Sequence, residues 1–389
     1  MKKIAIVSCY FQHNYGSMLQ ALATQMALDK LGIENETINI EGFRGEIKKS
    51  KIKYFVKASL TSDILASKFG MAKTVARRKL IKDDYSLKSR ERSKLFDDFY
   101  KENFRLSQKY NSITELSSKC DSNYSAVLVG SDQLWLPANI AADYYTLSFV
   151  PKNVNSVAYA TSFGQSSLPS DISKKASVFL KNIKHIGVRE ESGQKLVKQL
   201  AGRDVPVVCD PTLLFSGEEW LKIQKIEPII TEPYILCYFL GNNPPHREFA
   251  KRLREATGLK IVALVNLDEY VKSDNDYADF TPYDVNPADF LNLIRNASYV
   301  CTDSFHCSVF SILYRKIFFT FRRYTRNTKS STNSRLDTLF NMVGIDNRIF
   351  YGDEDVTNVL NQKIDFEYAN GRLAKEREKG YEFIKEAIK

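Results

Sequence analysis

The stretch MKKIAIVSCYFQHNYGSMLQALATQMALDKLGIENETINI, residues 1–40, decides the fold class. Residues 4–7 form an apolar run that predicts a short strand, and residues 17–31 carry apolar side chains at helical spacing. Ser17 is a typical N-cap residue for this helix. A second strand is predicted at residues 37–40. A strand, a helix and a further strand in this order are typical of the start of a doubly wound parallel sheet.

The same alternation continues along the chain after a basic segment at about 44–110. Strands are predicted at 126–130, 156–161, 186–189, 205–209, 234–240, 259–265, 299–302 and 317–321, and helices at 246–257, 287–296 and 305–315. We therefore predict an α/β protein with two Rossmann-like, doubly wound domains that face each other across a cleft, as in GT-B proteins. The predicted units are an N-terminal domain at 1–228 that contains the basic helical insertion, a C-terminal domain at 229–362, and a charged helix at 363–389 that packs back.

Length and charge agree with this organisation. A chain of 389 residues is too long for one compact core. Between Arg44 and Lys109 there are 19 Lys and Arg and 8 Asp and Glu, so this stretch carries a charge of +11. The whole chain carries +10, and the rest of the chain is therefore close to neutral, at −1. Such an excess indicates either an anionic partner, such as a membrane surface or substrate, or a solvated helix face. It lacks the interleaved aromatic residues of a nucleic-acid-binding fold, which disfavours nucleic acid as a partner.

Cysteine and histidine usage points away from metal and disulfide chemistry. The six cysteines include no C-x-x-C pair, and the four histidines form no cluster with them at metal-ligand spacing. The G-x-G-x-x-G, Walker A, H-E-x-x-H and G-x-S-x-G signatures are missing, which disfavours dinucleotide dehydrogenases and P-loop ATPases. The N-terminal apolar run is too short for a signal peptide, and no run of about 18 to 20 apolar residues occurs. We expect a cytoplasmic protein with reduced thiols, no metal and no cofactor.

Polar side chains follow two predicted strands of the first half. Ser131, Asp132, Gln133 and Trp135 come directly after one strand and could form a platform for a sugar, although a tight turn with a buried Trp explains them equally well. Arg189 ends another strand, where a guanidinium can hold a carboxylate or phosphate through two hydrogen bonds. An internal salt bridge to one of the two glutamates that follow Arg189 is the alternative.

A third loop, in the second half, leads from a strand into a helix. Ser304 and Ser308, with the backbone N–H groups at the helix start, could form a cradle for an anion. His306 would then lie beside the bound anion and could transfer protons. A purely structural histidine is the alternative, but the position between strand and helix favours catalysis.

Six short segments occur in order between residues 14 and about 345. They are Asn14-Tyr15-Gly16-Ser17 with Leu19-Gln20; Gly130-Ser131-Asp132-Gln133-Leu134-Trp135; Val188-Arg189-Glu190 with Ser192; Asp210-Pro211-Thr212-Leu213-Leu214; Thr302-Asp303-Ser304-Phe305-His306; and Asn333-Ser334-Arg335 with Leu339. Each is weak alone, but in this order and spacing they resemble the polysaccharide pyruvyl transferase family.

The resemblance implies a GT-B-like fold, phosphoenolpyruvate as donor and a sugar or lipid-linked oligosaccharide as acceptor, with a cyclic ketal as product. In this family an Arg after a strand and an Arg-x-His element bind the donor and supply the acid. Arg189 matches the first and His306 the histidine of the second, but Ser304 stands where the Arg would be. The missing charge could come from Arg322, Arg323, Arg326 or Arg335.

We therefore predict a pyruvyltransferase in which His306 is the acid and Asp132 or Asp303 orients or deprotonates the sugar hydroxyls. The predicted substrate-binding residues are Arg189, Ser304, Phe305, Ser308, Asn14, Gly16, Ser131, Gln133, Trp135 and Arg335. The basic stretch would bring the enzyme to an anionic membrane that carries the acceptor. A GT-B glycosyltransferase that uses a nucleotide sugar, and a non-catalytic glycan- or anion-binding protein, are the alternative functions.

Overall fold

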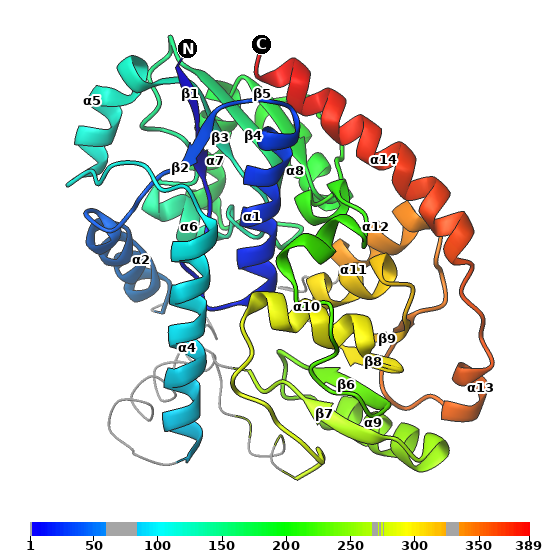
Figure 1. Ribbon diagram of the computed structural model, residues 1–389. Helices are drawn as coiled ribbons and strands as arrows, with labels where there is room; N and C mark the ends of the chain where they lie inside the picture. The colour runs from blue at the N-terminus through cyan, green and yellow to red at the C-terminus, as the bar shows by residue number, and fades with distance from the viewer. Residues whose placement is uncertain (1, 60–83, 267–270, 272–273, 275, 324–333) are drawn as a thin grey trace.

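The computed structural model describes residues 2–59, 84–266, 271, 274, 276–323 and 334–389. These residues form two five-stranded parallel sheets with helices around them (Figure 1). The α/β architecture with two doubly wound sheets that the sequence predicts is therefore confirmed.

The first sheet has the strand order β2-β1-β3-β4-β5, which is one of the common orders of doubly wound sheets. Its strands are β1 (Lys3–Val7), β2 (Asn35–Thr37), β3 (Tyr124–Val129), β4 (Asn155–Thr161) and β5 (His185–Val188). The helical elements of this half are α1 (Tyr15–Lys30), α2 (Arg44–Ser59), α4 (Asp84–Asn103), α5 (Ile113–Asn123), α6 (Pro137–Ala142), α7 (Ser170–Asn182), α8 (Glu191–Ala201), and the 3₁₀ turns η1 (Pro211–Leu214) and η2 (Glu219–Ile223).

The second sheet has the order β10-β9-β8-β6-β7, which is the same order read from the opposite edge. Its strands are β6 (Tyr234–Tyr238), β7 (Lys260–Ala263), β8 (Tyr299–Thr302), β9 (Ile317–Phe321) and β10 (Ile349–Phe350), and its helices are α9 (Pro244–Thr257), α10 (Pro287–Asn296), α11 (Phe305–Leu313), α12 (Ser334–Val343) and α13 (Val356–Leu360). All strand pairs are parallel. The points where strand order reverses, the usual ligand sites, therefore lie between β1 and β3 and between β6 and β8.

The hydrophobic core continues from one half into the other. One cluster of buried side chains contains Ile6 of the first sheet as well as Leu236 of the second. Helix α1 lies between the halves, and 13 of its 16 residues are buried. The ring of Tyr15 stacks on Phe290 with 4.4 Å between centroids, and its hydroxyl donates to the carbonyl oxygen of Val285 at 2.9 Å. These contacts fix the two halves to each other beside the loops that follow β1.

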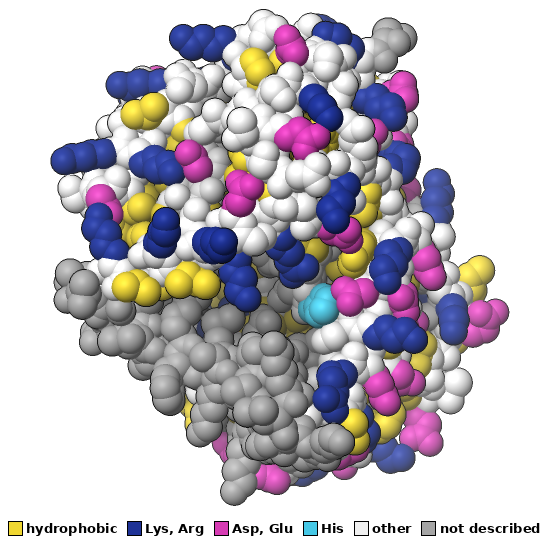
Figure 2. All heavy atoms as spheres, turned by 90° about the vertical axis from the view of Figure 1, so that its left-hand side faces the viewer, with side chains coloured by type: hydrophobic (Ala, Val, Ile, Leu, Met, Phe, Trp, Pro, Cys, Tyr) yellow, Lys and Arg dark blue, Asp and Glu magenta, His cyan; other side chains and the backbone are white. Residues whose placement is uncertain are grey.

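Part of the basic segment also connects the halves. Arg92, on α4, is fully buried and donates to the carbonyl oxygens of Val265 at 2.7 Å, Pro282 at 2.5 Å and Tyr283 at 3.1 Å. Helix α2 instead lies at the surface, and Figure 2 shows Lys and Arg side chains spread over that face beside exposed apolar ones. The middle of the predicted insertion, residues 60–83, lies outside the described residues.

Helix α14 (Phe366–Ala387) runs along both halves (Figure 1). Near its start, Glu367 pairs with Arg315 of the second half at 2.6 Å. Further along, Arg377 donates to the carbonyl oxygen of Leu213 at 2.8 Å, on the first half. Gly380 packs against Tyr159, whose hydroxyl would lie 2.6 Å from a Cβ atom at this position. The helix therefore covers part of the first sheet with residues that follow the second.

Two local predictions are wrong. Helix α1 begins at Tyr15 and is capped by Asn14, whose side chain accepts from the backbone N–H of Ser17 at 3.1 Å. Ser17 is not the cap, because its hydroxyl donates to Asp132 at 2.5 Å instead. Residues 205–209 form no strand; a single bridge joins Val207 to Val188, next to a proline that cannot donate to a ladder.

Candidate functional site

Arg189 lies immediately after β5, and 2% of its side chain is exposed. Its Nη1 donates to Asp210 Oδ2 at 2.9 Å and to the hydroxyl of Ser131 at 3.4 Å. Two further carboxylates lie beyond hydrogen-bond distance: Asp132 at 3.7 Å from Nη2 and Glu190 at 3.9 Å from Nε. Burial disfavours the charge of Arg189, but Asp210 and Asp132 together raise its pKa. The internal partner of Arg189 is therefore chiefly Asp210 and not one of the glutamates that follow it.

Asp210 holds Arg189 and His306 on one carboxylate. Its Oδ2 accepts from Arg189 and from Ser131, and it lies 3.4 Å from His306 Nε2. Its Oδ1 accepts from the N–H and the hydroxyl of Thr212, at 3.1 and 2.7 Å. Burial opposes ionisation, but His306 and Arg189 outweigh it and hold the pKa of Asp210 well below its usual range. Sequence reasoning placed Asp210 in a matching segment but missed its role at the site.

His306 lies in the first turn of α11 and meets the first turn of α1. A Cβ atom at Gly16 would come within 2.2 Å of His306 Nδ1, 2.5 Å of Cγ and 2.8 Å of Cβ. Only glycine therefore permits this approach between the two halves. The prediction that Gly16 and His306 belong to one site agrees with their contact, and Gly16 acts by leaving room for the imidazole.

A second guanidinium lies close to the first. The Phe305 ring has Arg189 Cζ at 4.6 Å and Arg335 Cζ at 5.8 Å from its centroid. Arg335 is the second residue of α12, so the two cations come from different halves. Burial and the charge of Arg189 lower the pKa of Arg335 to about 10. Two guanidinium groups that share one aromatic ring make a region of concentrated positive charge.

Donor groups at the centre of this cluster make no hydrogen bonds. Arg189 Nε, Arg189 Nη2 and His306 Nε2 are all buried, and none of them makes a hydrogen bond within the described residues. His306 Nε2 lies 3.4 Å from Asp210 Oδ2 but is not aligned with it for a hydrogen bond. A buried polar group without a partner costs about 1–3 kcal/mol, and more when it is charged. An anion with several oxygens would satisfy these donors at once. We conclude that the cluster has the composition and geometry of an anion site.

Asp132 follows β3 at the switch point of the first sheet. Its backbone has φ of 75°, the left-handed region, which a non-glycine residue adopts at some cost in strain. Its Oδ2 accepts from Ser17 at 2.5 Å and lies 3.9 Å from Cys9 Sγ. Burial disfavours its charge, but Arg189 and His306 lower the pKa of Asp132 overall. Asp132 is therefore an ionised carboxylate held beside the cationic cluster.

Glu190 is a buried carboxyl group that the site predictions did not include. Its Oε1 accepts from the hydroxyl of Ser162 at 2.9 Å and from the N–H of Phe163 at 3.2 Å. Its Oε2 has no hydrogen-bond partner in the described part of the chain. Burial outweighs the nearby Arg189 and raises the pKa of Glu190. Because Arg189 and Glu190 are adjacent in sequence, the strand end places both at the site.

The structure does not support the predicted roles of Asp303 and Ser308. Both carboxylate oxygens of Asp303 accept hydrogen bonds from backbone N–H groups, of Leu240 at 2.6 Å and of Gly241 at 2.8 Å. Asp303 therefore joins the loop after β8 to the loop after β6. The hydroxyl of Ser308 is buried and bonds to the carbonyl oxygen of Ser304 and the hydroxyl of Thr320. Neither side chain is available to a substrate.

Trp135 is not a sugar platform. Its side chain is fully buried, and its indole N–H donates to the carbonyl oxygen of Tyr145 at 3.0 Å. Gln133, two residues earlier, packs its amide against Gly164, where a Cβ atom would lie 2.4 Å from Nε2. Ser304 is the N-cap of α11, and its hydroxyl accepts from the N–H of Cys307 at 3.4 Å. These residues shape the loops around the site.

Of the four arginines that could replace the missing Arg, the structure favours Arg335. Arg322 is paired with Asp337 at 2.7 Å, and Arg323 with Asp303 at 3.6 Å, where it also donates to the Asp303 carbonyl oxygen at 3.0 Å. Arg326 lies outside the described residues, as does Asn333. Arg335 is thus the described candidate that stacks on the same ring as Arg189.

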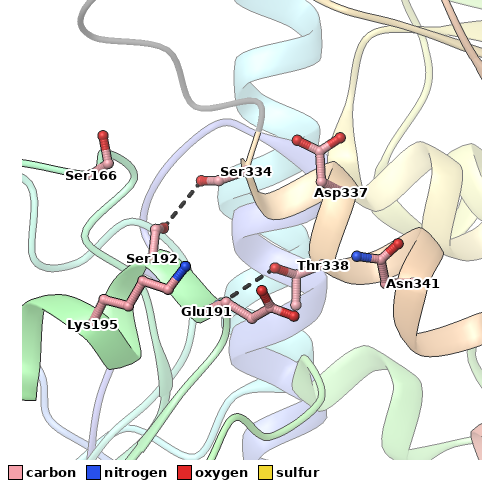
Figure 3. Close-up of a pocket in the computed structure, with 8 residues that line it drawn as sticks. All are labelled: Ser166, Glu191, Ser192, Lys195, Ser334, Asp337, Thr338 and Asn341. Atoms are coloured by element: carbon pink, nitrogen blue, oxygen red, sulfur yellow. Dashed lines mark hydrogen bonds between the residues drawn. The ribbon is translucent and has the colours of Figure 1, made fainter.

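A polar cavity of about 310 Å³ lies between α8 and α12 (Figure 3). It is lined by Ser166, Glu191, Ser192, Lys195, Ser334, Asp337, Thr338 and Asn341. Figure 3 shows Ser192 and Ser334 pointing toward each other, and their hydroxyls are 3.2 Å apart. The N–H of Glu191 donates to Thr338 Oγ1 at 3.4 Å. The walls of the cavity therefore come from both halves. Two of its lining residues, Glu191 and Ser334, are the sequence neighbours of Glu190 and Arg335.

The described part of the chain contains no group of three or more His, Cys, Asp or Glu side chains placed to hold a metal ion. None of its helices is long and apolar enough to cross a membrane. All six cysteines are buried and none forms a disulfide.

Comparison with known proteins gives a family for the chain. The profile of the family described as polysaccharide pyruvyl transferase matches residues 14–323. Comparison with curated proteins gave no match.

Solved structures with a similar fold have low sequence identity to this chain. They include UDP-GlcNAc 2-epimerase of Methanocaldococcus jannaschii (14% identity, TM-score 0.47, covering 97% of this chain and 94% of that one). The glycosyltransferase SnogD of Streptomyces nogalater has 10% identity and a TM-score of 0.45, with 98% and 96% covered. MurG of Acinetobacter baumannii has 9% identity and a TM-score of 0.41, with 97% and 95% covered.

Proposed function

The chain belongs to the polysaccharide pyruvyl transferase family, and from that premise we propose that it transfers a pyruvyl group from phosphoenolpyruvate to two hydroxyls of a sugar, forming a cyclic ketal. The observation that carries the proposal is the set of buried donor atoms on Arg189 and His306 that make no hydrogen bond. Phosphoenolpyruvate has a carboxylate and a phosphate, and both are groups that guanidinium donors bind well.

In this proposal the donor lies between the two halves. Arg189 and Arg335, which share the Phe305 ring, bind its carboxylate and phosphate. The start of α11 adds backbone N–H groups and a favourable helix dipole. Arg335 thus supplies the charge that the family's other Arg would supply, while Ser304 caps the helix.

The reaction needs one proton on carbon and two proton losses from hydroxyls. His306, as imidazolium, protonates the C3 methylene carbon, and positive charge develops at C2. The first sugar hydroxyl attacks C2 and loses its proton to Asp132. The second hydroxyl attacks C2 as the bond between C2 and the phosphate oxygen breaks, and its proton leaves with the phosphate. Asp210, 3.4 Å from His306 Nε2, orients the imidazole for the first step.

The experiment measures phosphate release from phosphoenolpyruvate with a panel of free and lipid-linked sugars. Proton transfer by a placed side chain contributes about 10²- to 10⁴-fold to the rate, so His306→Gln should lose turnover by that factor. The variant should still bind phosphoenolpyruvate and remain folded. Turnover near the wild-type rate in His306→Gln would remove its role as acid.

The main alternative function is that of a transferase that uses a nucleotide sugar. The melting temperature of the protein with each ligand distinguishes the two functions. Phosphoenolpyruvate should raise the melting temperature of the wild-type protein, because a ligand that binds the folded state stabilises it. Uridine diphosphate should leave the melting temperature unchanged. The opposite result, together with no consumption of phosphoenolpyruvate, would favour the nucleotide-sugar reaction.

We also place the enzyme in the cytoplasm, at a membrane surface that carries a lipid-linked acceptor. Six buried, unpaired cysteines agree with a reducing compartment. Helix α2 exposes Lys48, Lys49 and Lys53 together with Ile52, which is 50% exposed. Sedimentation with anionic vesicles should occur at low salt and decline as salt screens the lysines. No sedimentation at low salt would exclude this contact.

A further inference from the structure

The cavity between α8 and α12 is unusual because no apolar side chain lines it. All eight lining residues are polar, and five of them carry a hydroxyl or an amide. Small-molecule sites are usually lined mostly by hydrophobic and aromatic side chains. The carbon atoms of these side chains also form part of the wall, so a ligand that matches the lining has many hydroxyls on a small carbon frame, as a sugar has.

The charges at the cavity balance. Glu191 and Lys195 lie one turn apart on α8 and have opposite charge. On the other wall, Asp337 is held by Arg322 through hydrogen bonds of 2.7 and 3.3 Å. A carboxylate or phosphate would find no excess of positive charge there, in contrast to the cluster of Arg189 and Arg335 next to it. A neutral ligand is therefore favoured over an anionic one.

The cavity's size and position also restrict the ligand. Its volume of about 310 Å³ is near the lower end for small-molecule sites, which suits one sugar ring. Glu191 directly follows Glu190, and Ser334 directly precedes Arg335, so the backbone of each wall leads within one residue to a charged group of the buried cluster. The weak hydrogen bonds at 3.2 and 3.4 Å across the cavity can be exchanged for bonds to sugar hydroxyls at small cost.

We propose that this cavity is the acceptor subsite and that it binds one neutral sugar residue, whose hydroxyl pair faces the donor. The proposal rests on the proposed function for the identity of the donor, but the binding of the sugar can be measured without turnover. Thr338, Asn341 and Lys195 are the side chains that would contact the sugar hydroxyls.

The buried native cysteines permit a selective test. Lys195→Cys places a thiol in the cavity, while all six native thiols are buried, so sulfonatoethyl methanethiosulfonate should modify the new thiol alone. The matched control is Lys198→Cys, one turn along the same helix and exposed outside the cavity. The probes are methyl glycosides of glucose, galactose, mannose and N-acetylglucosamine, with methyl glucuronide as the charged counterpart. Binding is followed by saturation-transfer NMR with phosphoenolpyruvate present.

We expect at least one neutral glycoside to bind the wild-type protein and to protect Lys195→Cys from the reagent. Modified Lys195→Cys should bind it at least about tenfold more weakly, whereas modified Lys198→Cys should bind as the wild type does. Thr338→Val, which keeps the shape but removes the hydroxyl, should weaken binding about 2- to 10-fold through one lost hydrogen bond. Its affinity for phosphoenolpyruvate should stay unchanged.

Several results would overturn the assignment. These are no binding of any neutral glycoside, binding of the glucuronide alone, undiminished binding to modified Lys195→Cys, or equal loss in both modified proteins. The two proposals fail in different ways. A glycoside that binds in the cavity without phosphate release from phosphoenolpyruvate would retain the subsite and reject pyruvyl transfer. Phosphate release that persists in modified Lys195→Cys would reject the subsite and retain pyruvyl transfer.

Discussion

Gly16→Ala should damage the enzyme more than the same substitution at any other described glycine in a helix. The new carbon would lie 2.2 Å from His306 Nδ1, where non-bonded atoms prefer separations of about 3.5–4.0 Å. The imidazole must therefore move by about 1 Å or more, and its Cβ, at 2.8 Å, prevents a simple rotation. A shift of this size at a catalytic group costs about 10²-fold in rate, and overpacking costs about 1–3 kcal/mol in stability.

Phosphate release and urea unfolding measure these two effects. The control is Gly371→Ala on α14, where a Cβ atom would meet nothing within 4 Å. It should be neutral or raise stability by about 0.5–1 kcal/mol, because alanine favours the helix more than glycine does. A double variant, Gly16→Ala with His306→Ala, should recover most of the lost stability, since the clash then disappears. Additive losses in the double variant, or full activity in Gly16→Ala, would refute the close contact.

Three further predictions concern the buried charges. Arg189→Ala should weaken phosphoenolpyruvate binding, measured by calorimetry, by about 1.5–3 kcal/mol. It should also lower the free energy of unfolding by about 3–5 kcal/mol, because Asp210 is left buried without its partner. Unchanged affinity for phosphoenolpyruvate would show that Arg189 is purely structural. Asp210→Asn should be less stable than the wild type at neutral pH. Because the pKa of Asp210 is lowered in the folded state, its stabilisation is present above about pH 4 and is lost as the pH falls, so the two unfolding free energies should converge in acid; a constant difference would contradict the lowered pKa. Arg92→Met should lose about 1.5–3 kcal/mol in urea unfolding, whereas exposed Arg90→Met on the same helix should change by less than about 0.5 kcal/mol; equal effects would deny Arg92 its role in joining the halves.

The fold was predictable because its signal is local. Each strand of a parallel sheet is an apolar run followed by a helix, and the predicted bounds of 287–296, 299–302 and 317–321 agree with α10, β8 and β9. The errors arose where a distant partner decided the outcome. Ser17 has the chemistry of an N-cap, but Asp132, far along the chain, binds its hydroxyl.

The site was predictable in part, for the same reason. Arg189 follows β5 of the first sheet and His306 follows β8 of the second, so each stands at the carboxyl edge of its own sheet, where ligands of doubly wound folds bind. Their shared contact with Asp210 arises because the two halves face each other. Residue type cannot reveal the direction of a side chain. Trp135 and Asp303 occupy equally suitable loops, yet one points into the core and the other binds backbone N–H groups. Glu190 was missed because its importance depends on burial, which no local pattern shows.

The position of α14 has a consequence for synthesis. The surface that it covers, including Tyr159 and Leu214, belongs to strands and turns that leave the ribosome long before residues 366–387 do. Until then, the nascent first half exposes an apolar surface that chaperones can bind and that makes the chain prone to aggregation. The native packing of the first half is therefore completed only after the second half has also been translated.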